Sequence, residues 1–196
     1  DSKDTKSFES NSNIYSAIDR ILQNINARRS NGIVVGPEFS RMIAELLLQS
    51  IDTAVYNKLI NSSIKAGVKK MIAQSIAFVY EPTSFPYTED SDLLNFEDPI
   101  YGETSRAVSS LENQVLNAPF VGIILRNGLL YGDGTGFDKP VDFVPPVHVE
   151  AAAHAAFLAI KCDKNRIYNI SDVDERLSIQ RAKNELNWNP EYRVAH

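Results

Sequence analysis

The sequence has few of the residues that form covalent or metal cross-links. It contains one cysteine, Cys162, and three histidines among 196 residues. A single cysteine excludes an intrachain disulfide and a cysteine-based zinc site. His148 and His154 lie on either side of an expected strand-to-helix junction, and His196 is terminal. We therefore expect no metal site, with Cys162 as a packing residue and the histidines in surface or packing positions.

The chain also lacks long apolar runs and an excess of positive charge. No run approaches the ~20 apolar residues that span a bilayer, and no secretory signal pattern opens the sequence. The formal net charge of −5 argues against nucleic acid or an anionic membrane as a partner. We expect a cytoplasmic protein with no membrane partner. Because the sequence begins with Asp1 and not with Met, we also expect the start of the gene product to be missing.

The first part of the chain has a helical pattern behind a polar tail. Residues 1–13 are rich in Ser, Asp and Lys, which predicts a disordered tail. Apolar residues then recur at three- and four-residue spacing from Ile14 to Ile25, and again from Phe39 to Ile51. These stripes predict a helical segment over residues 14–60.

From about Asn61 the pattern changes to alternating strands and helices, which predicts an α/β protein with a parallel sheet. Short apolar runs bounded by Pro, Gly or polar residues indicate buried strands. The polar, acidic connection at residues 83–99 is expected to be a surface loop at the functional edge of the sheet, with a lid as one interpretation. The expected elements are a strand in 68–82, a helix from 102 to 117, a strand at 120–125, an extended edge at 141–149, a helix at 150–160, a strand at 166–170 and a helix at 178–187.

The segment Gly32–Arg41, GIVVGPEFSR, is followed by an apolar helix and Asp52. Together they resemble a conserved-motif region of bacterial reverse transcriptases of the phage-defence type, over about residues 14–58. Such polymerases carry paired aspartates for two Mg²⁺ ions, and this sequence contains no Asp-Asp pair. We therefore do not expect polymerase activity, and nucleic-acid binding through Arg41 ranks last among the alternatives.

Residues 61–194 contain several ordered blocks: AGVKKMIAQSIAFVYEP, YGETSRAVSSLENQVL, VGIILRNGLLYGDGTG, VHVEAAAHAAFLAI, RIYNISDVDE and ELNWNP. In this order they resemble the extended short-chain dehydrogenase/reductase family, the NAD-dependent epimerase/dehydratase group. The resemblance implies a partial Rossmann-like parallel sheet with flanking helices. It also implies NAD or NADP as cofactor and a small-molecule substrate such as a nucleotide sugar or another carbonyl or hydroxyl compound. A homo-oligomer is a further expectation.

The family uses a strand-end hydroxyl, a Tyr, and a Lys four residues after it that lowers the Tyr pKa and holds the cofactor ribose. By position, the resemblance assigns catalysis to Ser75 and Tyr101, and cofactor contacts to Tyr101, Ser105 and Arg106. Ser105 occupies the Lys position but is neutral, and Arg106 lies about 100° further round the helix. Tyr ionises near pH 10 without a neighbouring cation, so Tyr101 is expected to be a weak catalyst. Ser75 lies one residue before the usual hydroxyl position, which is Ile76.

The glycine-rich turn that binds dinucleotide pyrophosphate in this family has no counterpart before Asn61. The Gly132-x-Gly134-x-Gly136 run lacks the required spacing and is expected to be a flexible loop. We therefore expect a partial NAD(P)-dependent epimerase/dehydratase-like or reductase-like protein that is weak or inactive. A non-catalytic interaction module is the alternative, with an unpaired strand edge near residues 68–78 as its partner site.

Overall fold

The computed structural model describes residues 58–99 and 101–194, all of which belong to the second of two compact units, Leu47–His196. The predicted tail and nearly all of the predicted helical segment at 14–60 lie outside the described residues. Within the described part, no helix is long and apolar enough to cross a membrane.

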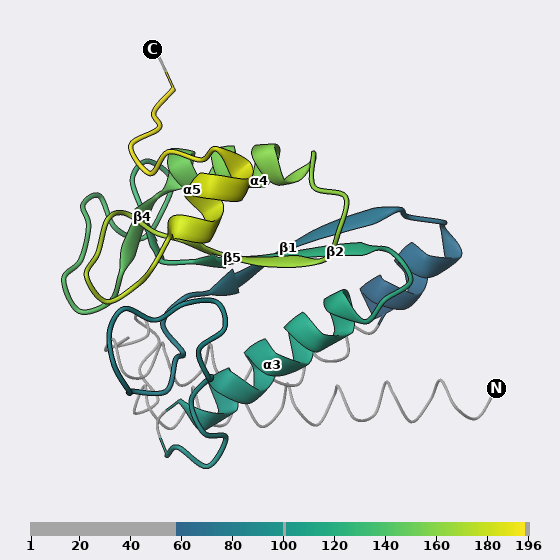
Figure 1. The fold of residues 1–196 in the computed structure, drawn as a ribbon, viewed down its shortest axis with the longest axis horizontal. Coiled ribbons are helices and arrows are strands. Elements are labelled where there is room, and N and C mark those ends of the chain that lie inside the picture. The colour runs from purple at the N-terminus through teal and green to yellow at the C-terminus, as the bar shows by residue number, and fades with distance from the viewer. Residues whose placement is uncertain (1–57, 100, 195–196) are drawn as a thin grey trace, which may run out of the picture. The chain divides into compact units, whose positions relative to one another are not determined.

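The core of the fold is a three-stranded parallel sheet with helices on both faces, as the alternation of elements predicts (Figure 1). The strand order is β1-β2-β5. Helix α3 lies on one face of the sheet, and α4 and α5 lie on the other (Figure 1). The bounds are β1 Lys70–Ile76, α3 Gly102–Leu116, β2 Val121–Asn127, α4 Val149–Ala159, β5 Arg166–Ile170 and α5 Gln180–Leu186.

The central strand β2 is apolar on both faces because both faces are covered. Ile123 and Leu125 belong to the cluster beneath α4 and α5, whereas Ile124 belongs to the cluster beneath α3. Full burial of one such side chain contributes about 1.5–3 kcal/mol. Helix α3 approaches β2 closely at Gly122, where a Cβ would lie 2.5 Å from the carbonyl oxygen of Val115. Glycine at this position therefore sets the helix-to-sheet distance.

A second, two-stranded parallel sheet consists of β3 (Leu129–Tyr131) and β4 (Pro146–His148). The sequence analysis did not predict β3, which lies directly before the glycine run. Gly128 permits this pairing, since a Cβ there would lie 2.4 Å from the carbonyl oxygen of Pro145. The extended edge expected at 141–149 is likewise shorter, with only β4 in a sheet.

The strand predicted within residues 68–82 ends at Ile76, and Ser75 is its penultimate residue. Tyr80 forms an isolated antiparallel bridge with Leu93, so the chain leaves the sheet before Pro82. The other elements agree with their predicted positions to within a few residues: α4 begins at Val149 and α5 at Gln180.

Candidate functional site

The three parallel strands end together, and polar side chains gather at their carboxyl ends. β1 pairs with β2 so that Ser75 lies opposite Arg126, and β2 pairs with β5 so that Arg126 lies opposite Asn169. All three side chains are buried. Open α/β sheets bind their ligands beyond this edge of the sheet, so these residues are the first candidates for a functional site.

Arg126 and Glu112 form a buried, bidentate ion pair between β2 and α3. Arg126 Nε donates to Glu112 Oε1 at 2.8 Å, and Arg126 Nη2 donates to Oε2 at 2.6 Å. The predicted catalytic residue Ser75 joins this pair, because its hydroxyl donates to Glu112 Oε1 at 2.8 Å. Burial by itself lowers the pKa of Arg126, but the hydrogen bonds and charge of Glu112 hold that pKa above its ordinary value. The Ser75 hydroxyl is therefore part of a charged structural network.

Tyr80 extends the network to the third strand. Its hydroxyl accepts from Arg126 Nη1 at 2.9 Å and donates to Asn169 Oδ1 at 2.5 Å. The Arg126 guanidinium carbon also lies 5.2 Å from the centroid of the Tyr80 ring. Burial raises the pKa of Tyr80, and the charge of Arg126 offsets only part of that rise. The phenol is therefore neutral at neutral pH and serves as a hydrogen-bond relay between β2 and β5.

Glu89 attaches the loop at residues 81–99 to the same edge of the sheet through hydrogen bonds. Its side chain is buried, and its Oε1 accepts from the backbone N–H of Asn169 at 2.9 Å. Its Oε2 lies 3.6 Å from Arg181 Nε, and its carbonyl oxygen accepts from Arg126 Nη1 at 3.2 Å. The sequence analysis missed Glu89, because a glutamate in an acidic loop gives no local signal of burial. The loop lies at the expected edge and is attached there by a buried carboxylate.

The other predicted site residues lie near the start of α3. Tyr101 is the N-cap residue and is 39% exposed, and its N–H donates to Asp98 Oδ1 at 2.7 Å. Ser105 is fully buried, and its hydroxyl donates to the carbonyl oxygen of Leu94 at 2.7 Å. Ser75 contacts α3 at Glu112, which lies eleven residues after Tyr101, about 16 Å along an ideal helix. The structure therefore brings Ser75 to one part of α3 and places Tyr101 and Ser105 at another.

Arg106 points to the loop that precedes α3. Its Nη2 donates to the carbonyl oxygen of Phe96 at 3.4 Å and lies 3.8 Å from Glu97 Oε1. Both charged side chains are mostly exposed, so this ion pair contributes little to stability. The assignment of Arg106 to a cofactor contact stays a prediction.

Two polar oxygens in the region of the strand ends are buried without a hydrogen-bond partner. One is Oδ1 of Asn127, the last residue of β2, whose side chain is only 5% exposed. The other is Oδ1 of Asp172, whose Oδ2 accepts from the Tyr131 hydroxyl at 2.8 Å. A buried polar group without a partner costs about 1–3 kcal/mol. Neither residue was singled out from the sequence; the only available signal for Asn127 was an amide at the end of an apolar strand.

The two described histidines have structural roles, as expected. His148 is the N-cap of α4, where its Nδ1 accepts from the N–H of Glu150 at 3.3 Å. His154 stacks on Tyr192, with ring centroids 3.8 Å apart. Among residues 58–99 and 101–194, no group of three or more His, Cys, Asp or Glu residues is placed to hold a metal ion.

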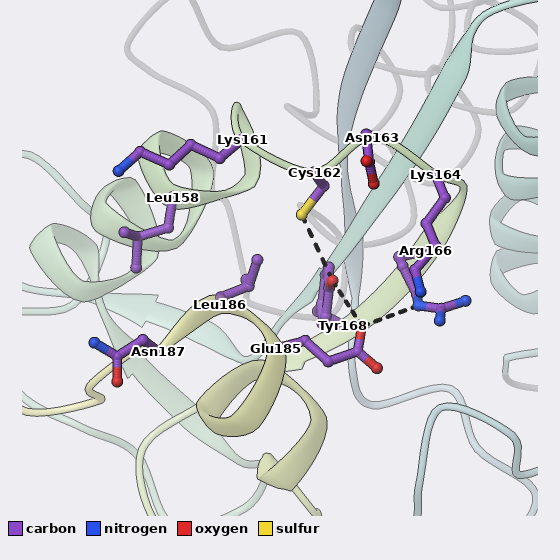
Figure 2. Close-up of a pocket in the computed structure, with 10 residues that line it drawn as sticks. All are labelled: Leu158, Lys161, Cys162, Asp163, Lys164, Arg166, Tyr168, Glu185, Leu186 and Asn187. Atoms are coloured by element: carbon purple, nitrogen blue, oxygen red, sulfur yellow. Dashed lines mark hydrogen bonds and ion pairs between the residues drawn. The ribbon is translucent and has the colours of Figure 1, made fainter.

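A cavity of about 600 Å³ lies at the opposite, amino end of the sheet, beside the first residue of β5 (Figure 2). Arg166 Nε donates to Glu185 Oε2 at 2.9 Å, and the Tyr168 hydroxyl donates to the same oxygen at 3.1 Å. The Cys162 sulfur lies 3.6 Å from that hydroxyl, so the thiol lines the cavity rather than only packing. Burial raises the pKa of Tyr168. Because the cavity lies at the amino end of the sheet, it is separate from the carboxyl edge, where parallel sheets bind ligands.

The Gly132–Gly136 run does not fit a dinucleotide pyrophosphate. Two of its N–H groups are used within the turn: Gly132 donates to the carbonyl oxygen of Phe137 at 2.8 Å, and Thr135 donates to that of Gly132 at 3.1 Å. The next described element is β4 rather than a helix, so the strand-turn-helix order of a dinucleotide site is not present here. In the described part of the chain, the residues present do not supply the cofactor cradle of a dinucleotide-binding fold.

Comparison with known proteins identifies the architecture. No family model matches the chain. The chain is 29% identical over 154 residues to a 3-diazoavenalumate denitrifying reductase from a Streptomyces species. The matched region covers 68% of this chain and 48% of the reductase. This chain thus spans about half the length of that curated relative.

Solved structures share the fold. A UDP-N-acetylglucosamine 4-epimerase from Bacillus cereus matches with a TM-score of 0.58 and 17% identity, over 72% of this chain and 65% of the epimerase. The dTDP-glucose 4,6-dehydratase DesIV from Streptomyces venezuelae, solved with NAD bound, matches with a TM-score of 0.60 and 15% identity, over 79% and 65% of the two chains. The chain has the Rossmann-like fold of epimerase/dehydratase enzymes. None of these matches is to a reverse transcriptase, and that resemblance stays a prediction for residues outside the described part.

Proposed function

We propose that this chain carries the substrate side of an NAD(P)-dependent reductase-like or epimerase/dehydratase-like protein, with weak activity. The fold and the reductase relative support the class. MoeE5, a structural neighbour at 16% identity and a TM-score of 0.57 over 70% of this chain and 65% of its own, was solved with UDP-glucuronic acid and NAD. A nucleotide sugar is therefore the substrate class to test first.

The observation that carries the proposal of weak activity is the position of Ser75. Its hydroxyl lies near the carboxyl end of a parallel strand, but it already donates to Glu112 at 2.8 Å inside a buried network. Ser105 is similarly committed to the carbonyl oxygen of Leu94. Two of the four predicted site residues thus donate their hydroxyl protons to hydrogen bonds within the protein. Tyr101 remains the candidate proton carrier.

Ligand-induced stabilisation tests the substrate class. A ligand that binds only the folded chain raises its unfolding temperature in proportion to RT ln(1 + [L]/Kd). We expect UDP-glucose at millimolar concentration to raise the unfolding temperature of the full chain, whereas inorganic pyrophosphate does not. Equal shifts with both compounds would point to general anion binding, and no shift with UDP-glucose would count against a nucleotide-sugar substrate.

The edge of β1 favours a second candidate function, strand-mediated association with another copy of this chain. In the described part of the sheet, β1 has a neighbour on one side only. Lys69 and Ala77 make their backbone bonds to β2, so by alternation the N–H of Gln74 faces away from β2. An edge of this kind is a template for another strand. We expect Gln74→Pro to reduce self-association in light scattering without unfolding the sheet. Glu97→Pro in the exposed loop is the control.

A further inference from the structure

Asn127 carries a buried amide oxygen to which no described residue of the chain donates a hydrogen bond. It is the last residue of the central strand and is only 5% exposed. Its Oδ1 is buried without a hydrogen-bond partner among the residues that the structure describes. Buried side-chain amides normally satisfy most of their hydrogen-bonding groups. The amide therefore calls for a partner from outside the described chain.

The neighbouring strands explain why the sheet gives Asn127 no partner. Alternation along β2 places Asn127 on the face of Leu125, away from Arg126 and its ion pair with α3. On either side of Asn127 in register are Ile76 of β1 and Ile170 of β5. Both are aliphatic and cannot donate a hydrogen bond. The amide therefore lies between two apolar side chains at the carboxyl edge of the sheet.

We propose that the Asn127 carboxamide binds a neutral hydrogen-bonding group of the ligand, either a hydroxyl or an amide. The unpartnered Oδ1 is an acceptor, so its partner has to supply an N–H or O–H proton. Ionised phosphate oxygens accept but do not donate, which excludes the diphosphate of a nucleotide as the partner of Oδ1. Both a sugar hydroxyl and a carboxamide satisfy this chemistry. The inference deepens the proposed function, since it names a residue that recognises the neutral part of that ligand.

Gln114 on α3 provides a matched control. Its Oε1 is also buried without a partner, but its Nε2 donates to Ser110 Oγ at 3.0 Å. It lies on the helix and not at the carboxyl end of a strand. Replacement of either amide by an apolar residue of similar size removes one unpartnered oxygen. Gln114→Met also removes the hydrogen bond to Ser110, so it is the more demanding control for a structural effect on binding.

The test follows the side-chain amide signal of Asn127 in ¹⁵N–¹H spectra of the full chain, assigned by its loss in Asn127→Leu. The titrants are UDP-glucose, NADH, acetamide as the smallest neutral donor and acceptor, and inorganic pyrophosphate. We expect acetamide and at least one of the two nucleotides to move this signal, and pyrophosphate to leave it in place. A response to UDP-glucose alone identifies a substrate hydroxyl, and a response to NADH alone identifies the cofactor.

Affinity provides the second readout. For the nucleotide that moves the signal, we expect Asn127→Leu to weaken binding by about threefold to tenfold, as loss of one neutral hydrogen bond does, and Gln114→Met to leave it unchanged. Binding that leaves the Asn127 signal in place, or equal affinity in Asn127→Leu, overturns the inference while the proposed function stands. A response to acetamide with no binding of either nucleotide supports the inference and contradicts the proposed function. No response to any neutral titrant overturns the inference.

Discussion

Arg126 and Glu112 face each other across the contact between β2 and α3 with side chains only 5% and 6% exposed, and their closest N···O distance is 2.6 Å. A pair of this kind is expensive to break, because removing one partner leaves the other charge buried and uncompensated. The pair also determines the state of Ser75, whose hydroxyl donates to the same carboxylate. The stability of the sheet edge and the hydrogen bonding of its serine thus have one origin.

The first prediction concerns this ion pair. Arg126→Met is expected to lower the free energy of unfolding by about 3–5 kcal/mol, because it leaves the Glu112 carboxylate buried without its cation. The double variant Glu112→Met/Arg126→Met is expected to recover most of that loss. Arg106→Met, which removes an exposed pair, is expected to change stability by less than about 1 kcal/mol. Urea unfolding measures all three, and equal effects of the two single variants would contradict a buried pair.

The second prediction concerns the attachment of the loop at residues 81–99. Glu89→Ala removes the acceptor for the Asn169 N–H and the partner of Arg181. We expect amide hydrogen exchange to accelerate by about tenfold or more at Glu81 and Leu94, whose N–H groups bond within this region. Glu97→Ala alters only an exposed side chain of the same loop and should leave their exchange unchanged. Unaltered exchange in Glu89→Ala would show that the loop is held elsewhere.

The third prediction concerns alkaline pH. Burial raises the pKa values of Tyr80, Tyr131 and Tyr168 in the folded chain above the ordinary value of 10.0. Above about pH 10 the unfolded chain releases these phenolic protons while the folded chain keeps them, so the folded state loses stability as pH rises. We expect the unfolding temperature to fall from about pH 10 upward, and ultraviolet titration to show fewer ionised tyrosines in the folded chain than in urea. Coincident titration curves would contradict the burial of these phenols.

The fourth prediction tests the missing lysine. The family resemblance suggests that Ser105→Lys would restore the cation beside Tyr101, but Ser105 is fully buried and bonded to the carbonyl oxygen of Leu94. A lysine there would bury an unpaired charge, at a cost of several kcal/mol. We therefore expect Ser105→Lys to unfold at lower urea concentration and to gain no cofactor affinity. Thr104→Lys on the same helix is the control for adding a cation there. A stable Ser105→Lys variant with tighter NADH binding would contradict this reading of the site.

Sequence patterns were sufficient for features that depend on local order. The alanine-rich run at residues 150–160 predicted α4 because helix propensity is a local property. The apolar run FVGIIL predicted β2 because a strand covered on both faces has to be apolar throughout. The resemblance of the ordered blocks to dehydrogenases predicted the Rossmann-like fold, which the solved structures share.

The features that were not predicted depend on tertiary contacts. Glu112 was not singled out, because nothing in a helical stripe shows that a glutamate will meet an arginine fourteen residues later on a strand. The hydrogen bond of Ser75 to Glu112 was not predicted, since a buried hydroxyl requires a partner that only the folded helix supplies. Glu89 and Asn127 were missed for related reasons: burial of a polar side chain is a property of the fold and not of its neighbours in sequence.

The most direct test of the account is a fluorescence titration of NADH and NADPH against the full chain and against Tyr101→Phe. The described residues lack a pyrophosphate cradle but have the fold and the polar strand ends of this enzyme class, so we expect saturable binding with a dissociation constant of about 1 mM. Tyr101→Phe is expected to bind more weakly than the native chain. No binding of either dinucleotide at millimolar concentration would contradict an NAD(P)-dependent function and favour a non-catalytic interaction module.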